Sequence, residues 1–120
     1  MNTIQLIPVT DLPELRHGDV LAELIAERVT LMAGDVVVVT QKAVSKVEGR
    51  VVPIDPDVPN DHKRLVEQES VRILRRRGDL IMSETRQGFV CANAGVDLSN
   101  VERGQAALLP VDPDRSARRI

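Results

Sequence analysis

The pattern of apolar and polar residues in the first third of the chain predicts a strand, a helix and a second strand. Residues 4–9 alternate between apolar and polar side chains, as a short strand does. Residues 12–15 form a predicted loop, because the proline within them removes a backbone donor and restricts the residue before it. Asp19 is a suitable N-cap for a helix over residues 20–28. The four valines at 36–39 are typical of a strand buried on both faces.

The middle of the chain predicts a short strand and a long helix. The strand covers residues 51–54 and ends in a connection rich in Pro and Asp. The helix covers residues 61–77, with Gly78 just past its end. Its apolar side chains at helical spacing are expected to face the core; they are Leu65, Val66, Ile73 and Leu74.

The last third predicts three strands and the start of a helix. Residues 80–85 and 89–96 form a strand pair, and residues 106–111 form a final strand. Asp112 is a fair N-cap and the proline after it suits the first helical position, so a helix begins there. The sequence stops at Ile120, and so short a terminal helix is marginal alone. We therefore expect all 120 residues to form one α/β domain, a mixed sheet with flanking helices, cut within its last helix.

Composition narrows the classes of function. Phe89 is the single aromatic residue and the net charge is -2, which disfavours both a base-stacking surface and a polyanion-binding one. We expect no nucleic-acid partner and no membrane association, because no apolar run approaches the roughly 20 residues that span a bilayer. Cys91 is the only cysteine, which excludes an intramolecular disulfide and favours a reducing compartment. The expected location is the cytoplasm.

Two lysines follow the valine run and are candidates for phosphate binding. Lys42 and Lys46 are four residues apart, so a helical turn would place both on one side. Lysine reaches phosphate oxygens as a point charge, and ligands of α/β proteins collect beyond strand ends. The alternative is a solvated pair of lysines. The chain has no GxxxxGK[ST] motif, so a P-loop does not hold any nucleotide.

A second polar group follows the strand predicted at 89–96. Asp97 offers a carboxylate suited to Mg²⁺ or Mn²⁺, and Asn100 offers an amide that can orient a phosphate. Gly95 would permit a close backbone approach. The alternative is an Asx turn, in which the polar side chains bond only to their own backbone. Glu84 is either a supporting carboxylate or an outward strand residue, Asn93 is equally a strand-end cap, and Cys91 is expected in the core.

Three strings of the sequence carry a family resemblance. They are GDVVVVTQKAVSKVEGRVV, RRRGDLIMSETRQGFVCANAGVDLSNV and LLPVDPDRSARRI. In this order they resemble the N-terminal half of the coenzyme F420-0:L-glutamate ligase (γ-glutamyl ligase) family. The resemblance starts at LIPVTDLPELRHGD and leaves only residues 55–63 nondescript. It implies an α/β fold with two intertwined halves, and a homodimer whose sites lie near the interface.

The resemblance also implies ligands. Family members use GTP and a divalent metal ion, Mg²⁺ or Mn²⁺, to attach L-glutamate through γ-linkages to coenzyme F420-0. By similarity, Asp97 is a metal ligand. The implied GTP contacts are Leu12, Pro13, Glu14, Leu15, Gln41, Lys46 and Asn100, and the family often has a small hydroxyl residue where Gln41 stands.

The resemblance leaves two classes of function. Family members are roughly twice as long, and a second metal-binding segment of the Asp-Thr type belongs to their other half. The first class is a GTP-dependent ligase, present here as an N-terminal fragment. No catalytic side chain is assigned, because phosphoryl transfer depends on positioning and charge neutralisation. The alternative is a non-catalytic GTP- or metal-binding module, or a dimerisation half.

Overall fold

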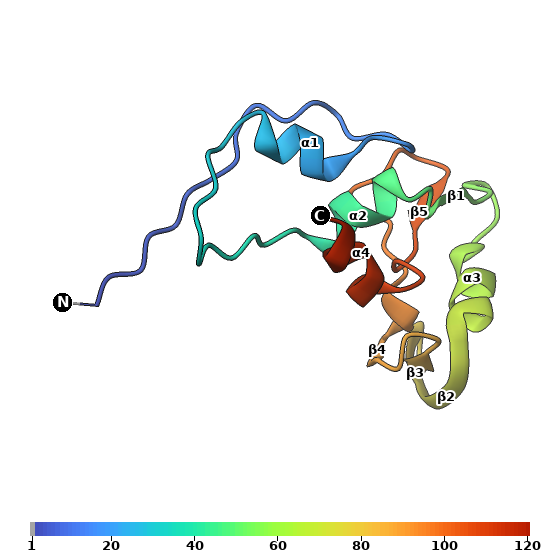
Figure 1. Cartoon of the computed structure of the whole chain (residues 1–120). Helices are drawn as coiled ribbons and strands as arrows, with labels where there is room; N and C mark the ends of the chain where they lie inside the picture. The colour runs from blue at the N-terminus through green and yellow to red at the C-terminus, as the bar shows by residue number, and fades with distance from the viewer. Residues whose placement is uncertain (1) are drawn as a thin grey trace.

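The computed structural model describes residues 2–120 and combines helices with antiparallel sheets, which confirms the α/β class (Figure 1). The helices are α1 (Leu21–Ala26), α2 (Gln41–Val47), α3 (His62–Glu69), the short 3₁₀ helix η1 (Asn93–Gly95) and α4 (Pro113–Arg119). The strands are β1 (Val51–Pro53), β2 (Ser70–Arg77), β3 (Leu80–Thr85), β4 (Val90–Ala92) and β5 (Gln105–Ala107). No helix among residues 2–120 is long and apolar enough to cross a bilayer.

The strands form two small sheets. In the larger sheet β3 lies between β2 and β4, and in the smaller one β1 pairs with β5. The predicted hairpin of residues 80–85 and 89–96 is confirmed, because Ser83 lies opposite Cys91 in the register of β3 and β4. Its second strand is shorter than predicted, since the chain turns into η1 after Ala92. The strand predicted at 106–111 is similarly reduced to β5.

Helix α3 supplies the side chains that fill two small core clusters. Leu65 packs with Ala106 and Leu108 of the β5 region, and Val66 packs with Ile81 of β3. Both residues were predicted to face the core, and both are buried. Because neighbouring residues of one helix enter separate clusters, α3 joins the two sheets into one body.

The prediction of a helix over residues 61–77 is wrong in its second half. Helix α3 ends at Glu69 and β2 begins at Ser70, with no connecting residues. Ser70 has an extended backbone, and its hydroxyl donates to the Val66 carbonyl at 2.5 Å, which satisfies one acceptor of the last helical turn. The residues after it pair with β3 instead, so Ile73 and Leu74 are partly exposed. Cross-strand pairing therefore outweighs the helical spacing of these apolar positions.

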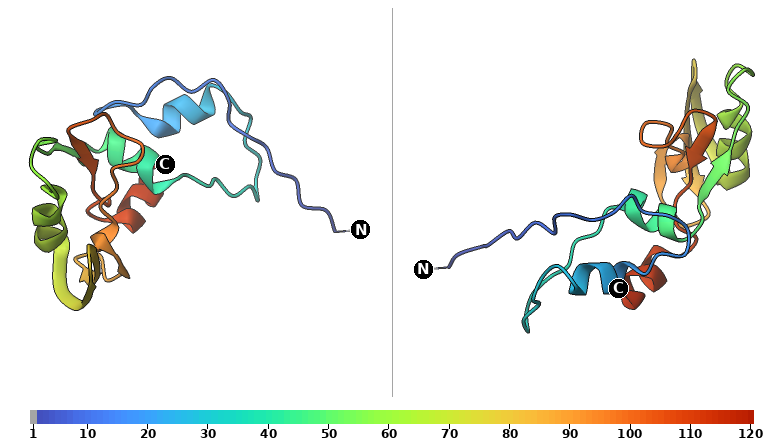
Figure 2. Two further views of the ribbon diagram at one scale, coloured as in Figure 1. Left: turned by 180° about the vertical axis from the view of Figure 1, so that it is seen from behind. Right: turned by 90° about the horizontal axis from the view of Figure 1, so that it is seen from above.

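The strands predicted at 4–9 and 36–39 are not formed, although both segments are extended (Figures 1 and 2). No strand within residues 2–120 pairs with either of them. Ile4 is 90% exposed and Val38 is 88% exposed, so the prediction of a strand buried on both faces is also wrong. The apolar pattern is real, but the described part of the chain supplies no backbone to complete the ladder.

The helix caps show where local signals decide the structure. Asp112 accepts a hydrogen bond from the Arg115 amide at 2.9 Å, which confirms it as the N-cap of α4. Asp19 was predicted to cap the first helix, and this is wrong. Its carboxylate accepts from the Arg16 amide at 2.7 Å, and Val20 is the N-cap without a side-chain bond. The carboxylate closes the preceding turn instead of starting the helix.

Replacing Ser83 by alanine is expected to stabilise the fold by up to about 1 kcal/mol, because a buried hydroxyl without a partner costs free energy. Ser83 is fully buried in β3, and its Oγ has no hydrogen-bond partner among the described residues. Ser45 is the matched control: it is equally buried, but its Oγ donates to the Leu108 carbonyl at 2.6 Å. Ser45→Ala should destabilise. Urea unfolding of both variants measures this, and equal losses would contradict the expectation.

Candidate functional site

The opening loop, residues 11–19, lies against the C-terminal half of α2. The Lys46 Nζ atom donates to Glu14 Oε1 at 2.6 Å, and the Gly18 amide donates to the Val47 carbonyl at 3.0 Å. At its other end, the Arg28 guanidinium donates to the Asp11 carbonyl at 3.1 Å. Two segments predicted to contact GTP, distant in sequence, are therefore in direct contact.

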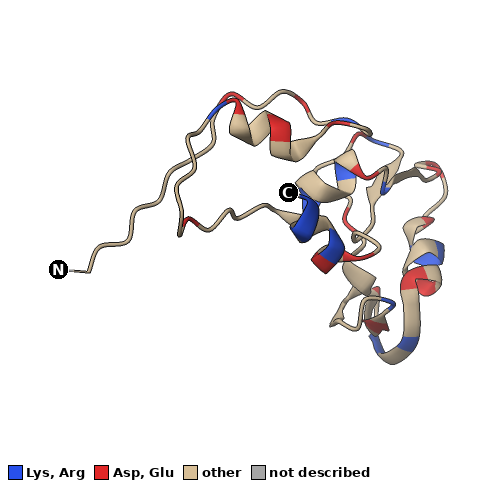
Figure 3. Cartoon of the chain, viewed as in Figure 1, with Lys and Arg blue, Asp and Glu red and all other residues tan. Residues whose placement is uncertain are grey.

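The opposite charges of Glu14 and Lys46 attract each other. The hydrogen bond from Lys46, followed by its positive charge, lowers the pKa of Glu14 below the ordinary value of 4.5. Glu14 thus stays ionised over the whole neutral range. Figure 3 shows basic residues on α2 and on β2. The Lys46 ammonium already has one carboxylate partner, so an arriving phosphate would compete with it.

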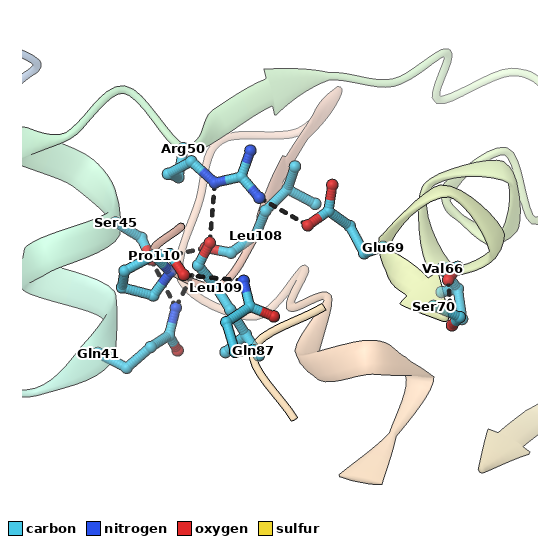
Figure 4. Close-up of polar contacts among 10 residues, drawn as sticks. All are labelled: Gln41, Ser45, Arg50, Val66, Glu69, Ser70, Gln87, Leu108, Leu109 and Pro110. Carbon is cyan, nitrogen blue, oxygen red and sulfur yellow. Dashed lines mark hydrogen bonds and ion pairs between the residues drawn. The ribbon is translucent and has the colours of Figure 1, made fainter. Parts of the chain in front are cut away.

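The residues after the valine run form helix α2, which begins at Gln41 and which the sequence pattern did not predict as a helix. The Thr40 side chain caps it by accepting from the Ala43 amide at 3.4 Å. The Gln41 amide nitrogen donates to Ser45 Oγ at 2.6 Å and to the Leu108 carbonyl at 3.3 Å (Figure 4). The amide nitrogen of Gln41 therefore anchors α2 to the chain after β5.

Asp97 lies beside β5 and forms a tight turn with the residues that follow it. Its backbone exchanges two hydrogen bonds with Ala107, at 2.9 and 2.8 Å. Its Oδ1 accepts from the Ser99 amide at 2.9 Å and from Ser99 Oγ at 2.7 Å, and Asn100 donates to that hydroxyl at 2.8 Å. The Asx turn that was the alternative interpretation is therefore present.

The Asx turn is compatible with a metal ligand. The hydrogen bonds from Ser99, and more weakly the Lys42 charge, lower the pKa of Asp97 below its usual 3.8, so the carboxylate is ionised at neutral pH. No group of three His, Cys, Asp or Glu side chains within residues 2–120 could hold a metal ion. Mg²⁺ at phosphate sites needs only one or two carboxylates besides phosphate and water. Asp97 fits the role of a single protein ligand in such a site.

Comparison with known proteins identifies the family. The family model described as F420-0:Gamma-glutamyl ligase matches residues 10–120. The chain belongs to this family. It is 42% identical to the coenzyme F420:L-glutamate ligase of Methanopyrus kandleri, over 98% of this chain and 52% of the relative. The ligases of Methanothermobacter thermautotrophicus and Archaeoglobus fulgidus are 40% and 37% identical, over 98% of this chain and 54% and 52% of their lengths. The chain thus spans about half the length of these curated relatives.

The predicted site residues of this chain come together only in part. Glu14 and Lys46 touch, and Asn100 contacts the Asp97 turn through Ser99. Other predicted residues lie in the opening loop or at the start of α2 and form no hydrogen bond to the Asp97 turn within residues 2–120; they are Leu12, Pro13, Leu15 and Gln41. Their roles as ligands stay predictions.

Three other polar candidates serve the fold of this chain. Glu84 forms an ion pair with Arg72 across β3 and β2 at 3.3 Å, which favours the interpretation as an outward strand residue. Asn93 Oδ1 accepts from the Ile81 amide at 3.0 Å, as a strand-end cap does. Cys91 is partly buried, and this burial raises the pKa of its thiol. Cys91 was expected in the core, and its partial burial bears this out only in part.

Residues that sequence reasoning missed hold the segment Leu108 to Pro110 next to α2 (Figure 4). Arg50 Nε donates to the Leu109 carbonyl at 2.8 Å, and Arg50 Nη2 pairs with Glu69 Oε2 at 2.6 Å. Gln87 Nε2 donates to the Pro110 carbonyl at 2.8 Å. No periodicity or motif marks these residues, because each contact joins a side chain to a backbone carbonyl or a carboxylate that is distant in the sequence.

Proposed function

We propose that this chain is part of a GTP-dependent ligase that attaches L-glutamate, through γ-linkages, to coenzyme F420-0. The supporting observation is the contact between Glu14 and Lys46, which unites two predicted GTP-binding segments. Asp97 is the proposed metal ligand. The positive charge of Lys42, which lies on the same helix as Lys46, contributes to lowering the pKa of the Asp97 carboxyl group. GTP and Mg²⁺ or Mn²⁺ are the proposed cofactors, and a cytoplasmic homodimer is the proposed assembly.

The chemistry requires activation of a carboxylate before an amide forms. The carboxylate of F420-0 takes the γ-phosphoryl group of GTP and releases GDP. The glutamate amine then attacks the acyl phosphate, loses a proton and displaces phosphate. When bound, the metal ion supplies charge neutralisation at the phosphate oxygens. Lys46 pairs with a phosphate oxygen in place of Glu14, and the opening loop positions the nucleotide.

A second candidate is a binding or dimerisation module without turnover of its own. Two observations favour it: the chain spans about half of its relatives, and the extended segments 4–9 and 36–39 present exposed apolar side chains. A module of this kind needs further polypeptide, from the remaining length typical of the family, to complete both the sheet and the site.

Asp97→Ala is expected to weaken metal-dependent GTP binding by at least about tenfold, or 1.4 kcal/mol, because it removes the proposed carboxylate ligand. Isothermal titration calorimetry with GTP, with and without Mn²⁺, measures the effect. Asp57→Ala is the control, since within residues 2–120 this carboxylate pairs only with the exposed Arg103 at 3.6 Å. Unchanged GTP binding in the Asp97 variant would mean that Asp97 stabilises the turn and is not a metal ligand.

The two candidate functions differ in turnover. Purified 120-residue protein is mixed with F420-0, L-glutamate, GTP and Mn²⁺, and γ-glutamyl product is followed by mass spectrometry. Product formed by this chain alone would contradict the hypothesis of a module without turnover. GTP binding without product would support the module, and addition of the complementary half of a curated relative should then restore turnover.

A further inference from the structure

We infer that His17 and Gly49 are positioning residues that seat the opening loop on α2, and through it set the distance between the loop and Lys46. The inference rests on the proposed GTP site, since its functional meaning depends on that site. Neither residue is among the predicted ligands. Each acts through the loop, because neither His17 nor Gly49 is the residue that pairs with Lys46.

Gly49 leaves no room for a side chain. It has a φ of +72°, and a Cβ placed there would lie 2.9 Å from both Cε1 and Nε2 of His17 and 3.1 Å from Cδ2. Atoms at such separations must move apart. The imidazole ring therefore lies directly against the glycine backbone, where only glycine fits.

The turn that carries His17 is fixed to the same end of α2. The Gly18 amide donates to the Val47 carbonyl at 3.0 Å, and the Asp19 amide donates to the Arg16 carbonyl at 3.1 Å. The Asp19 carboxylate closes the turn by accepting from the Arg16 amide. If the imidazole turns away from Gly49, the packing contact between this turn and the end of α2 is lost.

The same two segments carry the charged contact of the site. Glu14 precedes His17 by three residues, and Lys46 precedes Gly49 by three. The ion pair between Glu14 and Lys46 and the packing of His17 on Gly49 are thus two contacts between one loop and one helix end. The Glu14 side chain of this ion pair is 76% exposed, so the pair adds little rigidity. Seating of the loop therefore depends on the packing contact and the Gly18 bond.

Gly49→Ala should weaken GTP binding in the presence of Mn²⁺ by about tenfold, because the imidazole turns away and the loop loses the packing contact that seats it beside Lys46. Gly78→Ala is the matched control. Gly78 has a φ of +58°, so alanine there meets similar backbone strain, but nothing lies within 4 Å of the added Cβ. GTP affinity should be unchanged in that variant.

Removing the imidazole removes the same contact from the side of the loop. His17→Ala is therefore expected to weaken GTP binding about as much as Gly49→Ala does, and the double variant should lose no more than either single variant, a non-additive result that contacting residues show. Equal losses in the Gly49 and Gly78 variants, or losses that add in the double variant, would overturn the inference.

A readout independent of GTP separates this inference from the proposed function. Amide hydrogen exchange at Gly18 should accelerate in Gly49→Ala and in His17→Ala, whereas exchange at Asp35, which bonds to the Met32 carbonyl in another turn, should not change. If wild type binds no GTP, the proposed site fails, and the exchange data alone decide the seating of the loop. Unaltered exchange at Gly18 would contradict the seating itself.

Discussion

Arg50→Ala should lower the free energy of unfolding by about 3 kcal/mol, because it leaves the largely buried Glu69 carboxylate without its partner. The side chains of Arg50 and Glu69 are only 20% and 12% exposed, and their atoms are 2.6 Å apart. The substitution also removes the donor to the Leu109 carbonyl. Urea unfolding monitored by circular dichroism measures the loss.

Arg103→Ala is the control for this prediction. Arg103 pairs with Asp57 at 3.6 Å, and both side chains are more than four-fifths exposed. A pair of this kind contributes roughly 0 to 1 kcal/mol, so the variant should unfold nearly as wild type does. Comparable losses in the two arginine variants would mean that the pair with Glu69 adds no more than a surface contact.

Gly95→Ala should lower the free energy of unfolding by about 3 kcal/mol, since overpacking and a left-handed backbone both penalise alanine. A Cβ on Gly95 would lie 2.7 Å from Cγ and Cδ2 of Leu109, and the glycine has a φ of +72°. Thermal and urea unfolding test the prediction. Gly88→Ala is the control, because φ is +91° there and nothing lies within 4 Å.

The Gly95 variant also bears on the candidate metal site. Gly95 is two residues before Asp97, so a shift away from Leu109 would move the turn that carries the carboxylate. Adding Leu109→Ala should recover part of the stability by making room. If the double variant is no more stable than Gly95→Ala alone, the cost comes from the backbone conformation and not from the contact.

Local signals in the sequence predicted the elements that local interactions stabilise. Helix α4 starts where Asp112 and the proline after it indicate, and the β3–β4 hairpin turns at residues 86–88 as expected. Each of these depends on neighbours within a few residues. The α4 cap and the β3–β4 turn were therefore predictable from local pattern, although the cap predicted at Asp19 was wrong.

Contacts between distant segments were not predictable in the same way. The sequence did not predict the boundary between α3 and β2, because the apolar spacing of residues 61–77 suits a helix as well as a half-exposed strand. Pairing with β3 determines that the second half is a strand. The valines at 36–39 have the composition of a buried strand, yet burial requires a neighbour that the sequence pattern does not identify. Tertiary context determined both outcomes.

The candidate site was likewise predictable only in part from the sequence. The family strings pointed to Glu14, Lys46 and Asp97, but no spacing rule indicated that Glu14 and Lys46 touch. For Asp97 the two interpretations turned out to be compatible, since a carboxylate held by Ser99 is also ionised and oriented. Arg50 carried no signal at all, because its partners are a carbonyl and a carboxylate far along the chain.

The unpaired segments at 4–9 and 36–39 have a consequence for the fate of this chain in a cell. Extended apolar peptide with free backbone groups is what chaperones and processive proteases recognise in unfolded proteins, and Ile4 and Val38 present it on an otherwise folded body. Chaperones and proteases would therefore bind this chain at those two segments first. Its lifetime would be set by how quickly they are covered and not by the stability of the core.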